Sequence, residues 1–167
     1  MNRHNTREDF TKLIQENRGI LFKVCHSYCK NKTDIDDLAQ EMIYQLWKSF
    51  DSYDPAFKFS TWMYRVVLNV AISFYRKKKS SAAMLTLHEQ MIEIAEHPDE
   101  SFETEFKIRQ LRMFIDELKE LDKALIILYL EEKSYREIAE IMGITETNTA
   151  TKINRIKEQL KRKFSNS

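Results

Sequence analysis

The amino-acid sequence predicts an all-α protein of two small helical domains joined by an acidic linker, the C-terminal domain being a helix-turn-helix. The 167 residues include only two glycines and two prolines, too few turn formers for a β-sandwich, a barrel or a wound sheet. Apolar residues recur at intervals of three and four, the spacing of amphipathic helices. The formal charge is +5 over residues 1–80, −7 over 81–105 and +3 over 106–167, so we expect the domain boundaries there.

Several classes of protein are disfavoured by the same composition. Gly19 and Gly143 lie far apart, so the chain has no glycine-rich phosphate loop or dinucleotide fingerprint. The longest uncharged run, residues 66–75, is about half of a membrane span, and the N-terminus has no apolar signal segment. Cys25 and Cys29 are one helical turn apart with too few ligands nearby for zinc, which favours buried thiols. We therefore expect a cytoplasmic protein with no cofactor, no metal and no direct membrane insertion.

The first element, from Thr6 to Tyr28, has helical spacing with a break at residues 17–19, and Asp9 completes a capping box with Thr6. Thr33 or Asp34 is expected to cap the next helix. Its apolar stripe is predicted to face the core and consists of Ile35, Leu38, Ala39, Met42, Ile43, Leu46, Trp47 and Phe50. The opposite face carries Asp36, Asp37, Gln40 and Glu41.

A polar loop, residues 51–59, precedes a third helix that Ser60 is expected to cap. The loop holds Tyr53, Phe57 and Phe59, and the helix and its end carry several cations. Exposed aromatic rings interleaved with basic residues are what single-stranded nucleic acid requires, because bases stack on flat rings and phosphates need cations. An ordinary helix with one buried and one solvated face remains the alternative, and Trp62 fits either interpretation.

The C-terminal domain is predicted to begin with two apolar helices, residues 111–118 and 121–130. Ser134 then forms a capping box with Glu137 and begins a short helix that Gly143 ends, and Thr145 caps a further helix. Helix, tight glycine turn and helix is the geometry of a helix-turn-helix, whose second helix can enter a major groove. A plain helical hairpin with a basic face is the alternative.

Four sequence motifs, in order along the chain, resemble those of bacterial RNA polymerase sigma factors. The short two-domain layout is similar to the extracytoplasmic-function (ECF) branch, and the resemblance extends from about residue 10 to residue 163. The motifs are Asp37-Leu38-Ala39-Gln40-Glu41 with Leu46-Trp47, Phe59-Ser60-Thr61-Trp62-Met63-Tyr64-Arg65 with Asn69, Ser134-Tyr135-Arg136-Glu137-Ile138-Ala139, and Gly143-Ile144-Thr145-Glu146.

The resemblance implies a non-catalytic role in transcription initiation, with core RNA polymerase and promoter DNA, both duplex and melted strand, as partners and an anti-sigma factor as a further one. It assigns core polymerase binding to Asp37, Leu38, Gln40 and Glu41. It assigns capture of the melted minus-ten strand to Phe57, Lys58, Phe59, Ser60, Trp62, Arg65 and Asn69. It assigns the minus-thirty-five duplex to Ser134, Thr145, Thr147, Asn148, Thr151, Lys152 and Arg155.

Two further expectations concern the recognition helix and the linker of this chain. Residues 147–151 contain no cation, so base recognition is expected to depend on Asn and Thr contacts and on groove shape. The acidic linker is expected to occupy a cationic channel of the polymerase, as in similar sigma factors.

Two rival functions differ in mechanism. A stand-alone helix-turn-helix regulator would bind duplex DNA without polymerase. A nuclease with Asp34, Asp36 and Asp37 as metal ligands is disfavoured, because neighbouring helix positions point in different directions.

Overall fold

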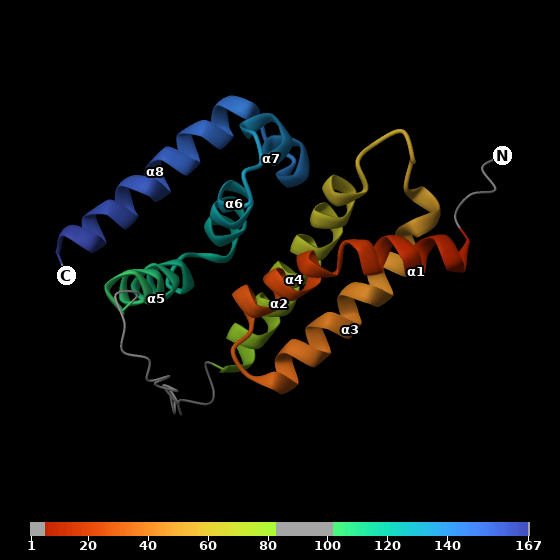
Figure 1. Ribbon diagram of the computed structural model, residues 1–167, viewed down its shortest axis with the longest axis horizontal. Helices are drawn as coiled ribbons and strands as arrows, with labels where there is room; N and C mark the ends of the chain where they lie inside the picture. Colours follow the sequence, from red (N-terminus) through yellow and green to blue (C-terminus); the bar gives the residue numbers. More distant parts are fainter. Residues whose placement is uncertain (1–5, 83–101, 167) are drawn as a thin grey trace.

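The computed structural model describes residues 6–82 and 102–166, and these are all-α apart from their loops and one 3-10 turn (Figure 1). The helices are α1 (Arg7–Glu16), α2 (Arg18–Tyr28), α3 (Lys32–Ser49), η1 (Phe50–Ser52), α4 (Phe59–Ala82), α5 (Phe102–Asp116), α6 (Glu120–Leu130), α7 (Tyr135–Met142) and α8 (Glu146–Ser165). Most of the expected acidic linker lies outside the described residues, and its last four residues, 102–105, form the start of α5.

The N-terminal half, residues 6–82, packs α2, α3 and α4 side by side, with α1 crossing one end of α3 (Figure 1). Thr6 and Asp9 form the expected capping box. The cap of α3 was predicted two or three residues too late. Asn31 Oδ1 accepts the Asp34 backbone N–H at 2.8 Å, because an asparagine side chain satisfies an N-terminal donor as well as threonine does. Similarly, α4 begins at Phe59, one residue before the expected cap Ser60.

The buried face of α3 is narrower than the apolar stripe that the sequence predicts for this helix. Leu38, Met42 and Leu46 recur at four-residue intervals and are fully buried. Ile43 and Trp47, each one position further along the chain, are 42% and 47% exposed, so their prediction as core residues is wrong. The turn of 100° per residue carries each of them from the seam facing α4 toward solvent.

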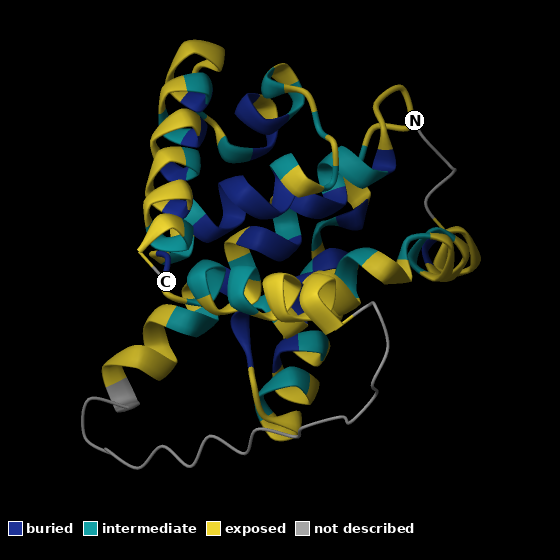
Figure 2. Cartoon of the chain, turned by 60° about the vertical axis from the view of Figure 1, so that its left-hand side comes forward, coloured by how far each residue is buried: buried dark blue, intermediate teal, exposed yellow. Residues whose placement is uncertain are grey.

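The C-terminal half, residues 102–166, is organised around α6. Residues 123–128 of this helix are all buried, as expected for an element covered on several sides. The short α7 and the long α8 pack on it and on each other, with Ile138, Ile153 and Ile156 fully buried. Figure 2 shows the buried positions gathered on the facing sides of the helices.

The two halves pack against each other, with α4 contacting both α6 and α7. Their buried apolar residues form one continuous core. The Tyr28 hydroxyl of α2 donates to the Glu120 carbonyl of α6 at 2.6 Å. Lys123 of α6 is 3% exposed, donates to the Ser27 carbonyl at 3.1 Å and lies over the rings of Tyr28 and Tyr75. The described halves therefore form one body.

Candidate nucleic-acid and polymerase interface

An aromatic cluster anchors the loop before α4. Trp62 packs against Phe50, Tyr53 and Phe59, with ring centroids 5.3 to 6.2 Å apart. Tyr53 also donates from its hydroxyl to the Phe57 carbonyl at 2.9 Å, which fixes the loop. Trp62 is half-buried in this cluster, so its ring supports the loop and leaves only part of its surface for a base.

The prediction that Phe59 contacts the melted strand is wrong. Its side chain is 8% exposed, because the first turn of α4 directs it into the cluster with Tyr53 and Trp62. Phe57, by contrast, is 63% exposed at the tip of the loop. Phe57 is therefore the aromatic ring on this surface that is available for stacking.

Three of the remaining predicted strand-binding residues, Lys58, Arg65 and Asn69, lie on one face of α4 and its loop, whereas Ser60 lies on another face and lines a separate cavity with Lys23 and Glu131. Lys58, Arg65 and Asn69 are exposed and Ser60 is partly exposed. Phe57, Trp62 and Arg65 line a cavity of about 280 Å³, and Glu140 of α7 closes one side of it. Lys58 forms a 3.4 Å ion pair with Glu137, also on α7. The structure thus brings one exposed ring and two cations together beside α7, with Asn69 one turn beyond Arg65 on α4.

The second predicted surface lies on α3. Asp37, Gln40 and Glu41 are exposed, as a docking face requires. The prediction that Leu38 contacts the polymerase is wrong. Leu38 is fully buried among the α3 and α4 side chains and acts through packing rather than contact with a partner.

Sequence reasoning missed the apolar part of this α3 surface. Ile43, Tyr44 and Trp47 are 42%, 56% and 47% exposed, and they line a cavity of about 570 Å³ with Phe10 and Gln40. Three large exposed apolar side chains within five residues form a patch typical of a protein interface. The signal was present in the sequence as an apolar stripe too wide for one helix seam.

The turn between α7 and α8 has the geometry that the sequence predicts. Gly143 has a φ of +68°, and the Ile144 N–H donates to the Ala139 carbonyl at 3.1 Å. The Thr145 hydroxyl oxygen accepts the Asn148 N–H at 3.0 Å and caps α8. The Ser134 hydroxyl oxygen similarly accepts the Glu137 N–H and caps α7. Ser134 and Thr145 are thus exposed residues whose hydroxyl groups already cap α7 and α8.

The first turns of α8 present short polar side chains to solvent. Thr147, Asn148 and Thr151 are exposed, with the Thr151 hydroxyl donating back to the Thr147 carbonyl at 3.1 Å. Asn148 therefore has the side chain in this region best able to read a base edge.

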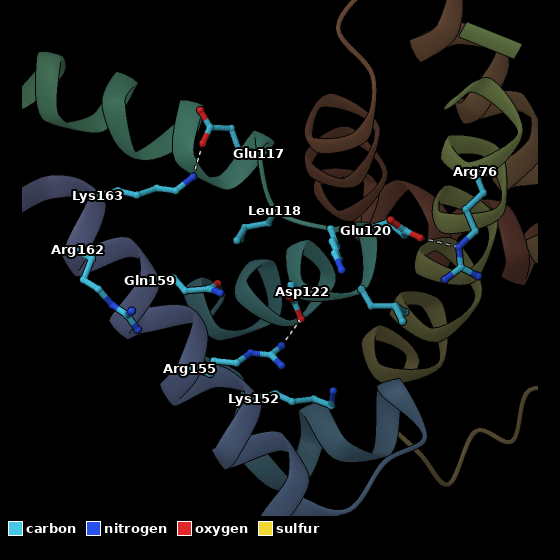
Figure 3. Close-up of a pocket in the computed structure, with 12 residues that line it drawn as sticks. Arg76, Glu117, Leu118, Glu120, Asp122, Lys152, Arg155, Gln159, Arg162 and Lys163 are labelled. Atoms are coloured by element: carbon cyan, nitrogen blue, oxygen red, sulfur yellow. Dashed lines mark hydrogen bonds and ion pairs between the residues drawn. The ribbon is translucent and has the colours of Figure 1, made fainter. Parts of the chain in front are cut away.

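Lys152 and Arg155 point instead into a groove of about 780 Å³ between α8 and the start of α6 (Figure 3). Arg155 pairs with Asp122 at 3.0 Å, Arg76 with Glu120 at 2.7 Å, and Lys163 with Glu117. The groove is lined by six cations and three acids, namely Arg76, Lys119, Lys152, Arg155, Arg162, Lys163, Glu117, Glu120 and Asp122. The cations of the recognition helix are therefore partly neutralised within the chain.

Other kinds of site have little support in the described parts of the chain. Residues 6–82 and 102–166 contain no group of three side chains suited to hold a metal ion. Cys25 and Cys29 are free and buried, and burial raises the pKa of each thiol to about 11. No described helix is both long and apolar enough to cross a membrane.

Two family models match the chain in the order of the surfaces just described. The model for sigma-70 region 2 matches residues 13–81, which include α3 and the aromatic loop. The model for sigma-70 region 4 matches residues 108–160, which include α7 and most of α8.

The chain belongs to the sigma-70 family.

Curated relatives place this sigma factor in the ECF branch. It is 26% identical to the ECF RNA polymerase sigma factor SigW of Bacillus subtilis, over 95% of this chain and 90% of that protein. It is 27% identical to the RNA polymerase sigma factor SigV of the same organism, over 92% of this chain and 89% of that protein.

Solved structures share the fold of this sigma factor. CnrH in complex with the cytosolic domain of CnrY superposes with a TM-score of 0.69 at 18% identity, over 97% of this chain and 91% of that one. RpoE in complex with the anti-sigma factor NepR from Bartonella quintana superposes with a TM-score of 0.72 at 17% identity, over 95% and 98%. The match to region 2 disfavours the stand-alone regulator, which has no need of a strand-capturing half.

Proposed function

We propose that this sigma factor docks on core RNA polymerase through α3, binds the melted minus-ten strand on α4 and binds the minus-thirty-five duplex through α8. The observation that carries the proposal is the surface at the start of α4, where exposed Phe57 stands beside Lys58 and Arg65, with Asn69 one turn beyond Arg65. A ring for an unstacked base next to cations for its phosphates suits single-stranded DNA. Strand binding worth about 1–3 kcal/mol per stacked base would supply free energy for opening.

The docking role of α3 rests on a mixed surface. Asp37, Gln40 and Glu41 give a polar part, and Ile43, Tyr44 and Trp47 give an apolar patch beside it. Protein interfaces commonly combine an apolar centre with a polar rim. Within this proposal Leu38 is a positioning residue that fixes the helix on the core.

The duplex role of α8 rests on the exposed Thr147, Asn148 and Thr151, followed directly by Lys152 and, about one turn after Thr151, by Arg155. The short polar side chains are suited to base edges, and the two cations are suited to phosphates. Ser134 and Thr145 act here as the caps of α7 and α8, the two helices of the motif.

The proposed domain boundaries are 1–80 for polymerase binding and melting, 81–105 for the acidic linker and 106–167 for the helix-turn-helix. The family models for residues 13–81 and 108–160 support this division. The proposed role is non-catalytic, and its proposed location is the cytoplasm, where bacterial polymerase works.

An anti-sigma factor is a further proposed partner. The structural relatives CnrH and RpoE were solved with CnrY and with the anti-sigma factor NepR. The exposed apolar patch of Ile43, Tyr44 and Trp47 offers such a protein a surface that it would share with polymerase.

Run-off transcription tests the proposal. Purified chain and bacterial core polymerase are incubated with a library of promoter fragments, and specific initiation that requires both proteins is the expected result. Asp37→Ala with Gln40→Ala should weaken polymerase binding, whereas Lys161→Ala on the exposed face of α8 is the control. Tight duplex binding by the chain alone, with no initiation at any fragment, would contradict it.

A further inference from the structure

The groove between α8 and the start of α6 carries more positive charge than its own ion pairs use. Each of its three acids pairs with one of its six cations. Within residues 6–82 and 102–166, no carboxylate pairs with the other three cations, which are Lys119, Lys152 and Arg162. Six cations against three acids leave the lining with a net charge of +3.

These three cations stand on different walls of one cavity. Lys152 and Arg162 belong to α8, and Lys119 belongs to the turn between α5 and α6. Arg76 of α4 lies across the groove from the two α8 residues (Figure 3). The volume of about 780 Å³ is that of a small-molecule site. A cavity whose walls carry an excess of one sign of charge concentrates small ions of the opposite sign.

The groove also offers surface to an uncharged part of a ligand. Leu121 is 48% exposed and lies beside Leu118, which gives an apolar area next to the cations. Gln159 of α8 is exposed in the same lining, and its amide can donate to and accept from a base edge or a sugar hydroxyl. Arginine and lysine side chains are the usual partners of phosphate groups. The lining therefore suits a ligand with several phosphates and an organic ring.

The shape of the groove favours a small ligand over duplex DNA. A duplex is read by a protein element that protrudes into its major groove, which is about 12 Å wide and admits one helix. Asn148, in the first turn of α8, is placed for such a contact. Arg162 lies about 21 Å farther along the helix axis, at 1.5 Å per residue, and lines a concave surface instead.

We propose that this groove binds a nucleoside polyphosphate, with its phosphates on Lys119, Lys152 and Arg162 and its nucleoside against Leu121. No glycine-rich loop is required, because side chains supply the positive charge. Lys152 also belongs to the set proposed for the minus-thirty-five duplex, so a bound nucleotide competes with duplex DNA for this cation. The competition rests on the proposed function, whereas the binding of the nucleotide does not.

Titration of the full chain with methylanthraniloyl-labelled ATP tests the site. The buffer contains EDTA, so that the triphosphate keeps its full charge. We expect saturable binding that unlabelled ATP displaces, with AMP about tenfold or more weaker, because the missing phosphates remove ion contacts. Tripolyphosphate, which has no nucleoside, should displace the label less well than ATP. Equal displacement by tripolyphosphate would overturn the nucleoside assignment, and the lack of saturable binding would overturn the site.

A double substitution tests which residues bind the nucleotide. Lys119→Ala with Arg162→Ala removes two exposed groove cations that the proposed duplex contact does not use. We expect about tenfold weaker binding of the label, the scale of two exposed ion contacts. The matched control is Lys12→Ala with Lys48→Ala, the same charge change on exposed positions of α1 and α3, which should stay within about twofold of wild type. Equal weakening in both variants would overturn the site, because net charge alone would then attract the nucleotide.

Competition is measured with a fluorescein-labelled duplex of 30 mixed-sequence base pairs, by anisotropy at constant ionic strength. At an ATP concentration of twice its own Kd, duplex binding by the wild type should weaken about threefold. The Lys119→Ala, Arg162→Ala variant should weaken only about 1.2-fold at the same concentration, because its ATP site is largely empty. Duplex binding that ATP leaves unchanged in the wild type would overturn the competition.

The outcomes for the site and for the proposed function are separable. If labelled ATP binds as expected but the chain initiates at no promoter in run-off transcription, the proposed function fails and the nucleotide site stands. If the chain initiates transcription but labelled ATP does not bind, the nucleotide site is wrong and the proposed function stands.

Discussion

Gly143 is the residue whose backbone conformation determines the turn into α8. Its φ is +68°, and a methyl group on its α-carbon would meet no atom within 4 Å. Gly143→Ala should therefore lower the free energy of unfolding by about 1–2 kcal/mol through backbone strain alone. Urea denaturation measures the change. Gly19→Ala is the matched control, since Gly19 lies in α2 with equally open space, and that variant should be unchanged or more stable by up to about 1 kcal/mol. An equal loss in both variants would contradict the strain argument.

Phe57 and Trp62 are neighbouring aromatic residues with different expected roles. Phe57 is 63% exposed, so Phe57→Ala should change the free energy of unfolding by less than about 0.5 kcal/mol. The same change should weaken single-strand binding by about 1–3 kcal/mol, the value of one stacked base. Trp62→Ala removes three ring contacts and should cost about 3 kcal/mol of stability. Anisotropy and urea denaturation on both variants check this, and a stability loss in Phe57→Ala would assign its ring to the core.

For the residues of α3, the sequence predicted an apolar stripe correctly but did not predict which of its members are buried. Spacing identified Leu38 as apolar on the inward stripe, and the family resemblance made it a contact residue, but the fold buries it completely. Trp47 lay on the same stripe and is exposed. Periodicity alone does not show which of the eight apolar residues of the predicted stripe are buried, because the position of the facing helix decides which of them are covered.

At the scale of the element, α7 depends on its capping box. The Glu137 carboxylate accepts the Ser134 backbone N–H at 2.9 Å, and this bond, with the Lys58 ammonium nearby, holds the pKa of Glu137 below its ordinary value of 4.5. A depressed pKa in the folded state means that the cap stabilises the protein above pH 4.5 and loses this effect as the pH falls through the folded value. Wild type should therefore melt higher than Glu137→Gln at pH 7, and the difference should shrink toward pH 3.

Thermal melts followed by circular dichroism at several pH values check the role of the cap. Glu140→Gln is the matched control on the same helix, because Glu140 takes no part in the capping box. If the two variants differ from wild type by the same amount at every pH, the cap does not carry the effect.

The ends of the helices were predictable where they depend on residues close together in the sequence. The capping boxes at Thr6 and Ser134 and the glycine turn at Gly143 were all visible in the sequence, because each depends on residues within about one helical turn. The cap at Asn31 was missed, since several capping residues follow one another and only the helix start decides among them.

At the scale of the molecule, the packing of the halves was not predictable. The expectation was of two modules with a linker between them, yet α6 and α7 rest on α4. The residues that join them include Arg76, Glu120 and Lys123, which in a sequence resemble an ordinary solvated face. The net charges of +5 and +3 did not indicate this contact either, because they hide the acids of the C-terminal half that pair with cations of the N-terminal half.

This packing predicts how the chain unfolds. One continuous core and the buried Lys123 link the halves, so the wild type should show a single calorimetric transition whose van't Hoff and calorimetric enthalpies agree. Lys123→Glu would place a carboxylate against the Ser27 carbonyl oxygen and two tyrosine ring faces, all of which repel negative charge. The halves should then separate and melt in two transitions, or in one whose van't Hoff enthalpy is clearly the smaller. Lys161→Glu, the same charge change on exposed α8, should keep the single transition. Two transitions in the wild type, or unchanged cooperativity in Lys123→Glu, would show that the halves are energetically independent despite their contact.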